Sequence, residues 1–254
     1  MPTTLATVLA VLTVLTAPSA VLAQSDSLSQ RAQAAFTASD WKTAAEAYAT
    51  LAQRTPDQPM PHFRLGVSLI NLKRGAEAKS HLETAERLGT PTIQVSYRLA
   101  QAEAQAGNRD AAFAQLARAT TAGLTSVNFA PDTDPLLAGL RGDGRWKDVL
   151  TAMERNANPC LFDPRMKELD FWLGDWDLRP RGNPTATPTR NVITKIHDGC
   201  VLLESYTAPG YTGQSFNIRD PSIGKWTQSW VDKGGGLHLY YGEVRDQTMY
   251  YVGE

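Results

Sequence analysis

The sequence predicts an α+β protein made of two different parts, a stack of helical hairpins followed by an antiparallel sheet. Three observations lead to this fold class. Similar residues recur every 34 positions in the first half, and this helical pattern gives way to alternation after Pro159. The second half is also rich in Trp, Tyr, Thr, Gly and Val. Helical repeats have periods of this length, and alternation of apolar and polar residues is typical of half-buried strands.

The repeat consists of three columns of residues, and each column has one member in each of three successive units. The columns are small residues, alanines and bulky residues: Ala32, Gly66 and Ala100; Ala44, Ala78 and Ala112; Tyr48, Leu82 and Leu116. Small residues let two helices approach closely, and a bulky apolar residue fills the remaining gap. A pair of short helices cannot bury its apolar face alone, so the copies are expected to stack. The alternative is an irregular helical bundle with accidental spacing.

The period and the order of small and large residues resemble the tetratricopeptide repeat family. Trp41 stands where that pattern has an aromatic residue, and Pro56 and Pro91 stand near its proline. The resemblance implies a tetratricopeptide-type α-solenoid of about three helical hairpins over residues 24–125. Capping helices and a linker are expected over residues 126–158, because the exposed end of such an array must be covered.

Turn residues divide this half into its expected helices. Breaks are predicted at residues 39–40, 55–61, 73–75, 89–91 and 107–108, where glycine, proline, asparagine and aspartate interrupt the helical pattern. Beyond the repeats, Asp134 followed by Pro135 is typical of a helix start. Residues 143–155 then predict a last helix with an apolar stripe.

In the tetratricopeptide family the first helix of each repeat lines the concave surface. By that resemblance the groove residues are mostly apolar or aromatic: Phe36, Phe63, Val67, Ile70, Tyr97 and Gln101. The lysine and asparagine set with which some members hold a partner's terminal carboxylate is absent. We therefore expect an extended or helical peptide of a partner protein, held by burial of its side chains. The alternative is that these residues belong to the core or are covered by the second domain.

Alternating segments in the second half predict strands over residues 192–196, 201–207, 215–218, 225–231, 237–243 and 248–252. The turn from Asp220 to Gly224 joins two of them, with a proline that presets the bend and a glycine that accepts positive φ. Short strands joined by tight turns predict an antiparallel meander, and hence a barrel or a sandwich.

Three strings carry a second resemblance: residues 169–177, residues 198–200 and residues 226–232. They resemble a bacterial domain family of unassigned function with a lipocalin-like barrel, over residues 159–254. Gly174 and Trp176 also resemble the first-strand signature of the calycin group. In that group the tryptophan closes one end of the barrel beneath an arginine from the last strand.

The end of the sequence falls inside an expected strand. A closed barrel needs about eight strands, whereas six or seven are recognisable here. Either the sequence is incomplete at its C-terminus or the domain is an open sheet. We favour the first explanation, because an unpaired aromatic edge strand is an aggregation hazard.

Some side chains of the expected strands could line a pocket for a small apolar ligand. The candidates are Trp176, Glu204, Arg219, Gln228, Trp230 and His238, with Asn217 and Trp226 beside them. Whether they point inward or toward solvent stays open, because a shift of one residue exchanges the two faces of a strand.

The first 23 residues carry no charged side chain, and an apolar run extends from Leu5 to Ala17. This pattern predicts a signal peptide that is cleaved near Ala23, and hence a periplasmic or secreted protein. The alternative is a short anchoring helix that stays attached. In an oxidising compartment Cys160 and Cys200 are expected to form a disulfide. The alternative is two buried thiols.

Composition and motifs exclude several functions. With 25 basic and 26 acidic residues, the chain has no charge excess that would hold nucleic acid. The apolar run is too short for a stable membrane span. The four histidines (His62, His81, His197 and His238) have no i, i+4 pair, so no metal centre is predicted, and no cofactor or catalytic residue is expected. The sequence thus predicts an exported, non-enzymatic interaction protein. The alternative is a haem or lipid carrier, or a hydrolase, that acts through the sheet.

Overall fold

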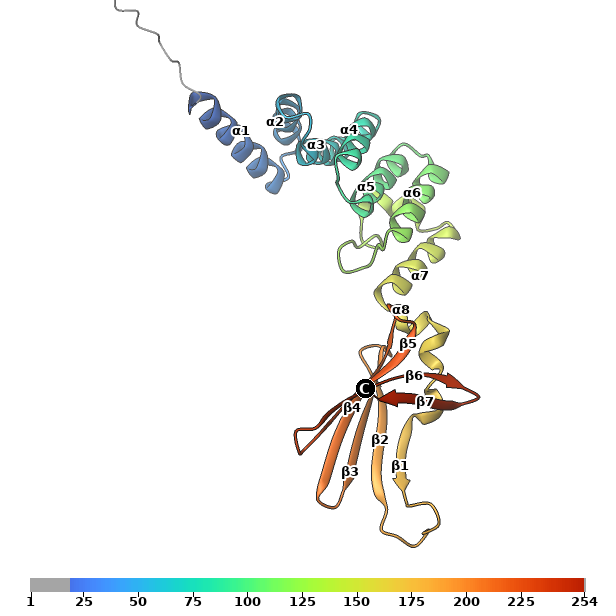
Figure 1. Cartoon of the computed structure of the whole chain (residues 1–254). Coiled ribbons are helices and arrows are strands. Elements are labelled where there is room, and N and C mark those ends of the chain that lie inside the picture. Colours follow the sequence, from blue (N-terminus) through green and yellow to red (C-terminus); the bar gives the residue numbers. More distant parts are fainter. Residues whose placement is uncertain (1–18, 254) are drawn as a thin grey trace, which may run out of the picture. The chain divides into compact units, whose positions relative to one another are not determined.

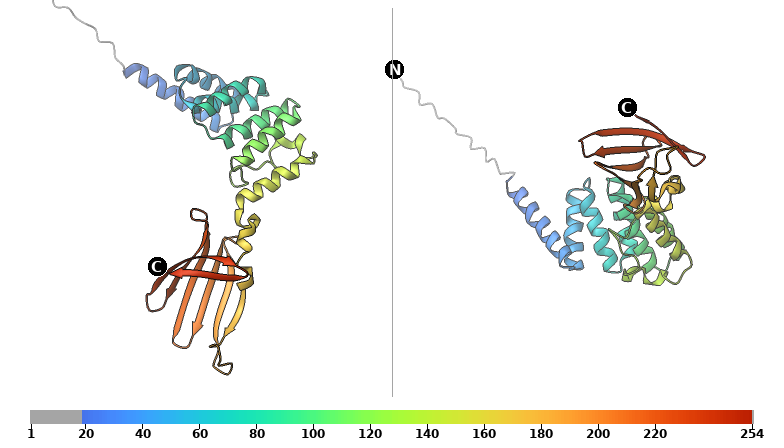
Figure 2. Two further views of the ribbon diagram at one scale, coloured as in Figure 1. Left: turned by 45° about the vertical axis from the view of Figure 1, so that its right-hand side comes forward. Right: turned by 90° about the horizontal axis from the view of Figure 1, so that it is seen from below.

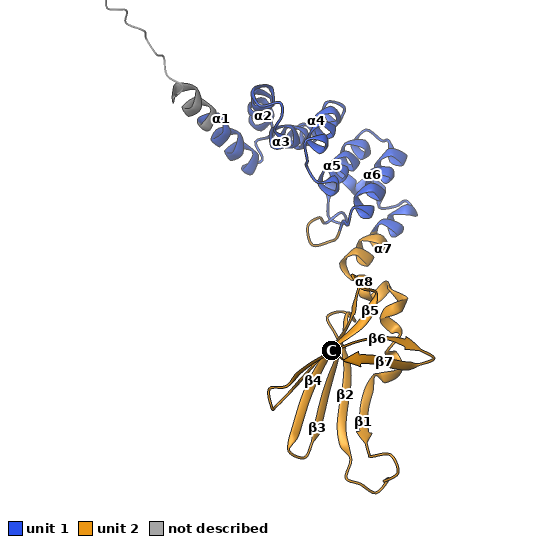
Figure 3. Cartoon of the chain, viewed as in Figure 1, with its two compact units in different colours: residues 1–124, 130–149 blue, residues 125–129, 150–254 orange. Residues whose placement is uncertain are grey.

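The computed structural model describes the backbone of residues 19–253 and the side chains of residues 27–253 (Figure 1). Residues 1–18 of the expected signal peptide lie outside the described residues, and residues 19–23 belong to the first helix. The chain divides into two compact units, which Figure 3 colours differently. The first contains the residues up to Leu124 and Ala130–Val149, and the second contains Thr125–Phe129 and the residues from Leu150.

The first unit is a stack of helices joined by short turns. Its helices are α1 (Ser19–Thr37), α2 (Trp41–Arg54), α3 (Pro59–Asn71), α4 (Gly75–Arg87), α5 (Thr92–Gln105) and α6 (Arg109–Thr121), followed by the 3₁₀ helix η1 (Pro135–Leu140) and by α7 (Arg145–Ala157), which ends in the second unit. Among the helices that the structure describes, none is long and apolar enough to cross a membrane.

The helix ends follow the turn chemistry of the sequence. The Asp40 carboxylate caps α2 by accepting a hydrogen bond from the backbone N–H of Thr43, at 3.2 Å. Pro59 occupies the first turn of α3, where its missing N–H has no cost. Gly89 and Gly107 follow α4 and α5 with φ of +106° and +79°, a conformation that favours glycine. Each predicted break therefore coincides with a helix boundary.

The 34-residue period is a structural repeat. Helices α2, α4 and α6 begin at residues 41, 75 and 109, at intervals of 34. Every member of the three columns is buried, which places the repeated residues in the core between successive helices. At Gly66 the approach is so close that an added Cβ would lie 2.7 Å from Leu82 Cγ. The helical hairpins of the expected tetratricopeptide-like fold are confirmed in the order that the sequence predicts.

The second unit is a seven-stranded antiparallel meander, in which every strand pairs with its neighbour in sequence. Its strands are β1 (Gly174–Leu178), β2 (Thr189–Ile196), β3 (Val201–Ala208), β4 (Tyr211–Asp220), β5 (Lys225–Asp232), β6 (Leu237–Arg245) and β7 (Thr248–Gly253). The sheet curls strongly, so that β6 and β7 run across the direction of β2 and β3 in both views (Figures 1 and 2). The antiparallel, barrel-like fold is confirmed, as an open half-barrel over the described residues.

Short helices fill one end of the half-barrel. They are α8 (Pro159–Phe162), η2 (Pro164–Lys167) and η3 (Asp170–Trp172). Leu169 follows η2 and packs in the core with Ile193, Leu202 and Trp226, all nearly inaccessible to solvent. The expected disulfide is present, because Cys160 and Cys200 are bonded. It ties the start of this segment to the turn between β2 and β3.

Candidate interaction groove and polar sheet interior

The first candidate site is a groove in the helical unit with a volume of about 550 Å³. It is lined by α1, α2, the turn after α2 and the start of α3: Ser29, Gln30, Gln33, Tyr48, Leu51, Arg54, Thr55, Gln58, Met60, Pro61 and Arg64. Most of its accessible surface is apolar. Met60 is 52% exposed although it is a large apolar residue. Concave, mostly apolar surfaces with a few polar groups are typical of binding sites.

Arg64 organises one wall of this groove. Its Nη1 donates a hydrogen bond of 2.7 Å to the hydroxyl oxygen of Tyr48. Its guanidinium carbon lies 5.2 Å from the ring centre of Phe36 and 5.7 Å from that of Tyr48. Contacts of this kind fix a cation over the negative faces of two rings. Phe36 in turn packs edge-on against Trp41 and Tyr48. The wall is therefore rigid and positively charged.

The charge of the groove is one-sided. Arg54 and Arg64 line it, and Arg31 and Arg54 line a smaller hollow beside it, between α1 and α2. No aspartate or glutamate is found among the described lining residues of either hollow. Such a surface attracts anionic groups, and its attraction falls as salt concentration rises.

The structure distributes the six expected groove residues over two environments. Phe36 and Phe63 are partly buried at the surface of the helical core. The other four, Val67, Ile70, Tyr97 and Gln101, are buried. None of the six is among the lining residues of the groove described above, so their role in binding stays a prediction.

Tyr97 and Gln101 are buried because the chain folds back over them. The helix η1 packs against α5, and Asp134 at its start accepts hydrogen bonds from both side chains, at 2.7 Å from Tyr97 Oη and 2.5 Å from Gln101 Nε2. Burial raises the pKa of Tyr97 well above its usual value, and the nearby Asp134 carboxylate adds to the increase. The contact spans more than thirty positions of sequence, and no local pattern indicates it.

The sequence shows no paired histidines, but two of them lie together in the structure. His62 on α3 and His81 on α4 face each other, with 3.2 Å between their Nδ1 atoms. His62 is buried, and its Nε2 atom has no hydrogen-bond partner in the described structure. Burial lowers the pKa of His81, and the neighbouring His62 lowers it further, against the opposing effect of Glu77.

The second candidate site is the interior of the half-barrel. The strand register places Glu204, Ser215, Trp230 and His238 directly opposite one another on β3, β4, β5 and β6. Gln228 and Arg219 point to the same face, because they lie two and four residues from these positions on their strands. Trp176 reaches this face through its pairing with Asn191 on β2. All six expected pocket residues thus share one face of the sheet.

A buried polar network occupies the centre of that face. The Glu204 carboxylate, 7% exposed, accepts hydrogen bonds from Asn191 Nδ2 and Ser215 Oγ, both at 2.7 Å, and from Gln228 Nε2 at 3.1 Å. Tyr251 from β7 joins the network by donating to Asn217 Oδ1 at 2.8 Å. The donors around Glu204 are neutral side chains, so they satisfy the carboxylate without a counter-charge.

Burial raises the pKa of Tyr251, and the charge of Glu204 adds to the increase. Asn191, Ser215 and Tyr251 were not predicted as members of this network. Residues two positions apart on a strand share a face, so one known inward residue on β2, β4 or β7 would have identified them.

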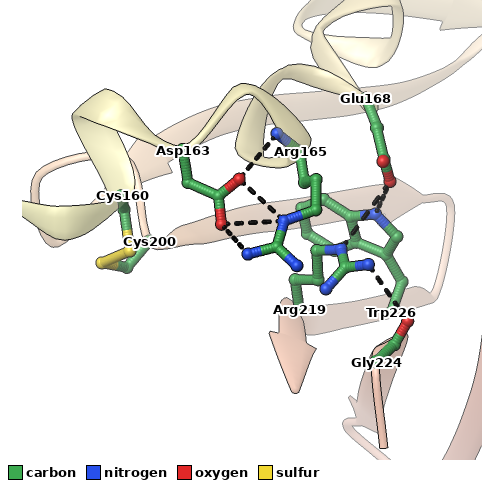
Figure 4. A network of polar contacts seen from close by, with 8 residues as sticks. All are labelled: Cys160, Asp163, Arg165, Glu168, Cys200, Arg219, Gly224 and Trp226. Carbon is green, nitrogen blue, oxygen red and sulfur yellow. Dashed lines mark hydrogen bonds and ion pairs between the residues drawn. A yellow bond between two sulfur atoms is a disulfide. The ribbon is translucent and has the colours of Figure 1, made fainter. Parts of the chain in front are cut away.

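The tryptophan that fills the end of the half-barrel is Trp226 (Figure 4). It is 1% exposed, and its Nε1 donates a 2.9 Å hydrogen bond to the Glu168 carboxylate. Arg219 lies beside it on β4, 3.9 Å from the same carboxylate, and donates to the Gly224 carbonyl. Trp176, for which the resemblance implies this position, is 42% exposed over the described residues.

Trp230 and His238 share the face of Glu204 but do not take part in its hydrogen bonds. Trp230 donates to the Tyr211 hydroxyl and packs edge-on against Tyr206. His238 is exposed and stacks on Tyr240. No group of three or more side chains suited to a metal ion occurs in the described part of the chain.

Comparisons with known proteins identify no family. No family model matches the sequence, and no curated protein matches it. One similar solved structure is described as the TPR2B-domain:pHsp70 complex of yeast Sti1, with 17% sequence identity and a TM-score of 0.37. The match covers 53% of this chain and 97% of that chain. At this score the likeness carries no argument, and our description of the helical unit rests on its hairpins and on the burial of the repeated columns.

Proposed function

We propose that this chain is an exported interaction protein whose helical unit holds a segment of a partner protein in the groove between α1 and α3. One observation carries the proposal. The groove combines an apolar surface that includes Tyr48, Leu51 and Met60 with arginines and no described acidic residue. A partner segment that fits has apolar side chains for the groove and carboxylates beside them.

The apolar and the charged residues of the groove have different roles in binding. Apolar groups buried against Met60 and Leu51 supply the affinity, because burial removes apolar surface from water. The arginines supply orientation and the rate of encounter, because exposed charge pairs add little affinity of their own.

Binding of peptides of equal length tests the proposal. Fluorescence anisotropy is measured for three labelled peptides with the same apolar residues, flanked by aspartates, by serines or by lysines. We expect the aspartate peptide to bind best, and its affinity to fall as salt is added. Equal binding of the lysine peptide would refute the assignment of charge, and binding of none would refute the groove itself.

A charge reversal in the groove has a matched control. Arg54 and Arg87 each lie in the last turn of a helix, on α2 and α4, but only Arg54 lines the groove. Arg54→Glu and Arg87→Glu therefore perturb their helix dipoles alike. We expect only Arg54→Glu to weaken binding of the aspartate peptide.

Export is part of the same proposal. The disulfide supports it, because such bonds persist in oxidising compartments. Mass spectrometry of the mature protein tests it, since cleavage near Ala23 leaves a chain that begins at Gln24. Detection of the intact N-terminus in the cytoplasm would contradict export.

The half-barrel provides the second candidate function, as a ligand-binding domain of the lipocalin-like type. The resemblance of its strings and its curled sheet support this idea. A small apolar ligand, haem or lipid would lie against the aromatic residues around Trp230, away from Glu204. Extraction of the purified full-length chain with organic solvent, together with its visible absorption spectrum, distinguishes these ligands from an empty domain or from a hydrolase.

A further inference from the structure

The pair formed by His62 and His81 has a geometry that the interaction function does not use. Helices α3 and α4 form one hairpin (Figure 1), and each contributes one imidazole. The two rings approach through the same atom, Nδ1, at 3.2 Å, with 5.5 Å between ring centres and planes tilted by 30°. A hydrogen-bonded histidine in a core usually has both of its nitrogens satisfied, whereas His62 Nε2 has no partner in the described structure.

The separation of the two nitrogens matches that of two ligands on one metal ion. Zinc lies about 2.0–2.1 Å from a histidine nitrogen in a tetrahedral site. Two such ligands are then about 3.3 Å apart, from the same bond lengths and the tetrahedral angle. The observed separation of 3.2 Å is close to this value.

The site is open on one side. His81 lines a groove of about 370 Å³ between α2, α3 and α4, together with Glu46 and Glu77. Glu77 stands one helical turn before His81 on α4, on the same face of the helix. Its carboxylate is held by Arg74 at 2.6 Å, so it contributes negative charge nearby rather than a bond to the ion. His81 lines this groove whereas His62 does not, so water reaches the pair from the side of His81.

We propose that His62 and His81 form a two-histidine site for a divalent transition-metal ion, with zinc as its probe and water as the other ligands. An ion bound there links α3 to α4 and stiffens one helical hairpin of the repeat stack. Histidine ligands usually donate their second nitrogen to a partner, and loss of such a partner weakens binding about 10–100-fold. We therefore expect weaker binding than at a structural zinc site.

Isothermal titration with Zn²⁺ tests the site in the full chain, purified without a histidine tag. The sequence offers matched controls, because its four histidines are His62, His81, His197 and His238. We expect one Zn²⁺ to bind, and His81→Asn to weaken binding at least about tenfold. His197→Asn and His238→Asn should leave the affinity unchanged. Asparagine is suited to position 197, where φ is +51°.

A measurement on the unmodified chain covers the case in which His81→Asn fails to fold. In ¹⁵N spectra of the imidazoles, Zn²⁺ should shift the Nδ1 resonances of two rings and leave the other two in place. The proposal is overturned if Zn²⁺ does not bind, if His81→Asn binds it with unchanged affinity, or if the shifted resonances belong to His197 or His238.

Discussion

The close contact between Gly66 and Leu82 provides a quantitative test of the repeat packing. An added Cβ at Gly66 would lie 2.7 Å from Leu82 Cγ and 2.8 Å from its Cδ2. Overpacking of this kind costs about 1–3 kcal/mol. Alanine also stabilises a helix interior by about 1 kcal/mol relative to glycine. We therefore expect Gly66→Ala to change the stability of the helical unit by between roughly zero and 2 kcal/mol, in the destabilising direction.

Removal of Leu82 changes this balance. The side chain is fully buried, so Leu82→Ala is expected to cost about 2–5 kcal/mol. In that background Gly66→Ala meets no clash and stabilises by about 1 kcal/mol. The two substitutions together are then more stable than the sum of their single effects, by about 1–3 kcal/mol.

Urea unfolding, followed by far-ultraviolet circular dichroism, measures the stability of the helical unit in the wild type, in the two single variants and in the double variant. Gly75→Ala is a suitable control, because its added Cβ would contact Ala102 and not Leu82. It should show no coupling to Leu82→Ala. A coupling energy below about 0.5 kcal/mol between positions 66 and 82, which is the limit of additivity for independent sites, would refute the packing described for this repeat.

Three further outcomes are expected in the sheet unit. Glu204→Gln should destabilise it by about 1–3 kcal/mol, because an amide brings a donor against the donors that now bind the carboxylate. Thermal unfolding measures this change, and a variant more stable than the wild type would contradict the network. Replacing Cys160 and Cys200 by serine should lower the free energy of unfolding by about 2–4 kcal/mol, since the bond closes a loop 40 residues long. Urea unfolding compares the oxidised chain with the variant, and equal stabilities would argue against that restraint. Hydrogen bonds from Arg165 lower the pKa of Asp163 to about 2, so their contribution to stability is present above pH 4 and is lost as pH falls toward 2. An NMR titration should show this pKa rise in Arg165→Leu, but not to its ordinary value, because the backbone N–H of residue 165 still donates to the carboxylate. An unchanged pKa would show that another group causes the shift.

Features set by local sequence patterns could be predicted closely. The columns led by Ala44 predicted three equivalent helices, which begin 34 residues apart, because each column position must be small or bulky to let helices pack. Turn residues such as Asp40 fixed the boundaries, since their effect on the backbone is local. Alternation predicted the strands β2 to β7, whereas β1 was indicated only by the resemblance that Gly174 and Trp176 carry.

Features set by long-range contacts could not be predicted. Nothing near Tyr97 indicates that Asp134 will return to cover it, so an expected surface residue became part of the core. The approach of His62 to His81 depends on the rotation of two helices about their axes. The resemblance suggested Trp176 as the buried indole, whereas the register of β4 and β5 places Trp226 beside Arg219.

The most direct test of the proposed function is to locate the partner at the groove. A photo-crosslinking amino acid is placed at Met60, which lies in the groove, and at Val127, which is 83% exposed outside it. Mass spectrometry then identifies the segments crosslinked to the full chain in its own cells. The account predicts adducts at position 60 with apolar segments that carry carboxylates, and none of these at position 127. Partner segments that crosslink at 127 and never at 60 would contradict it.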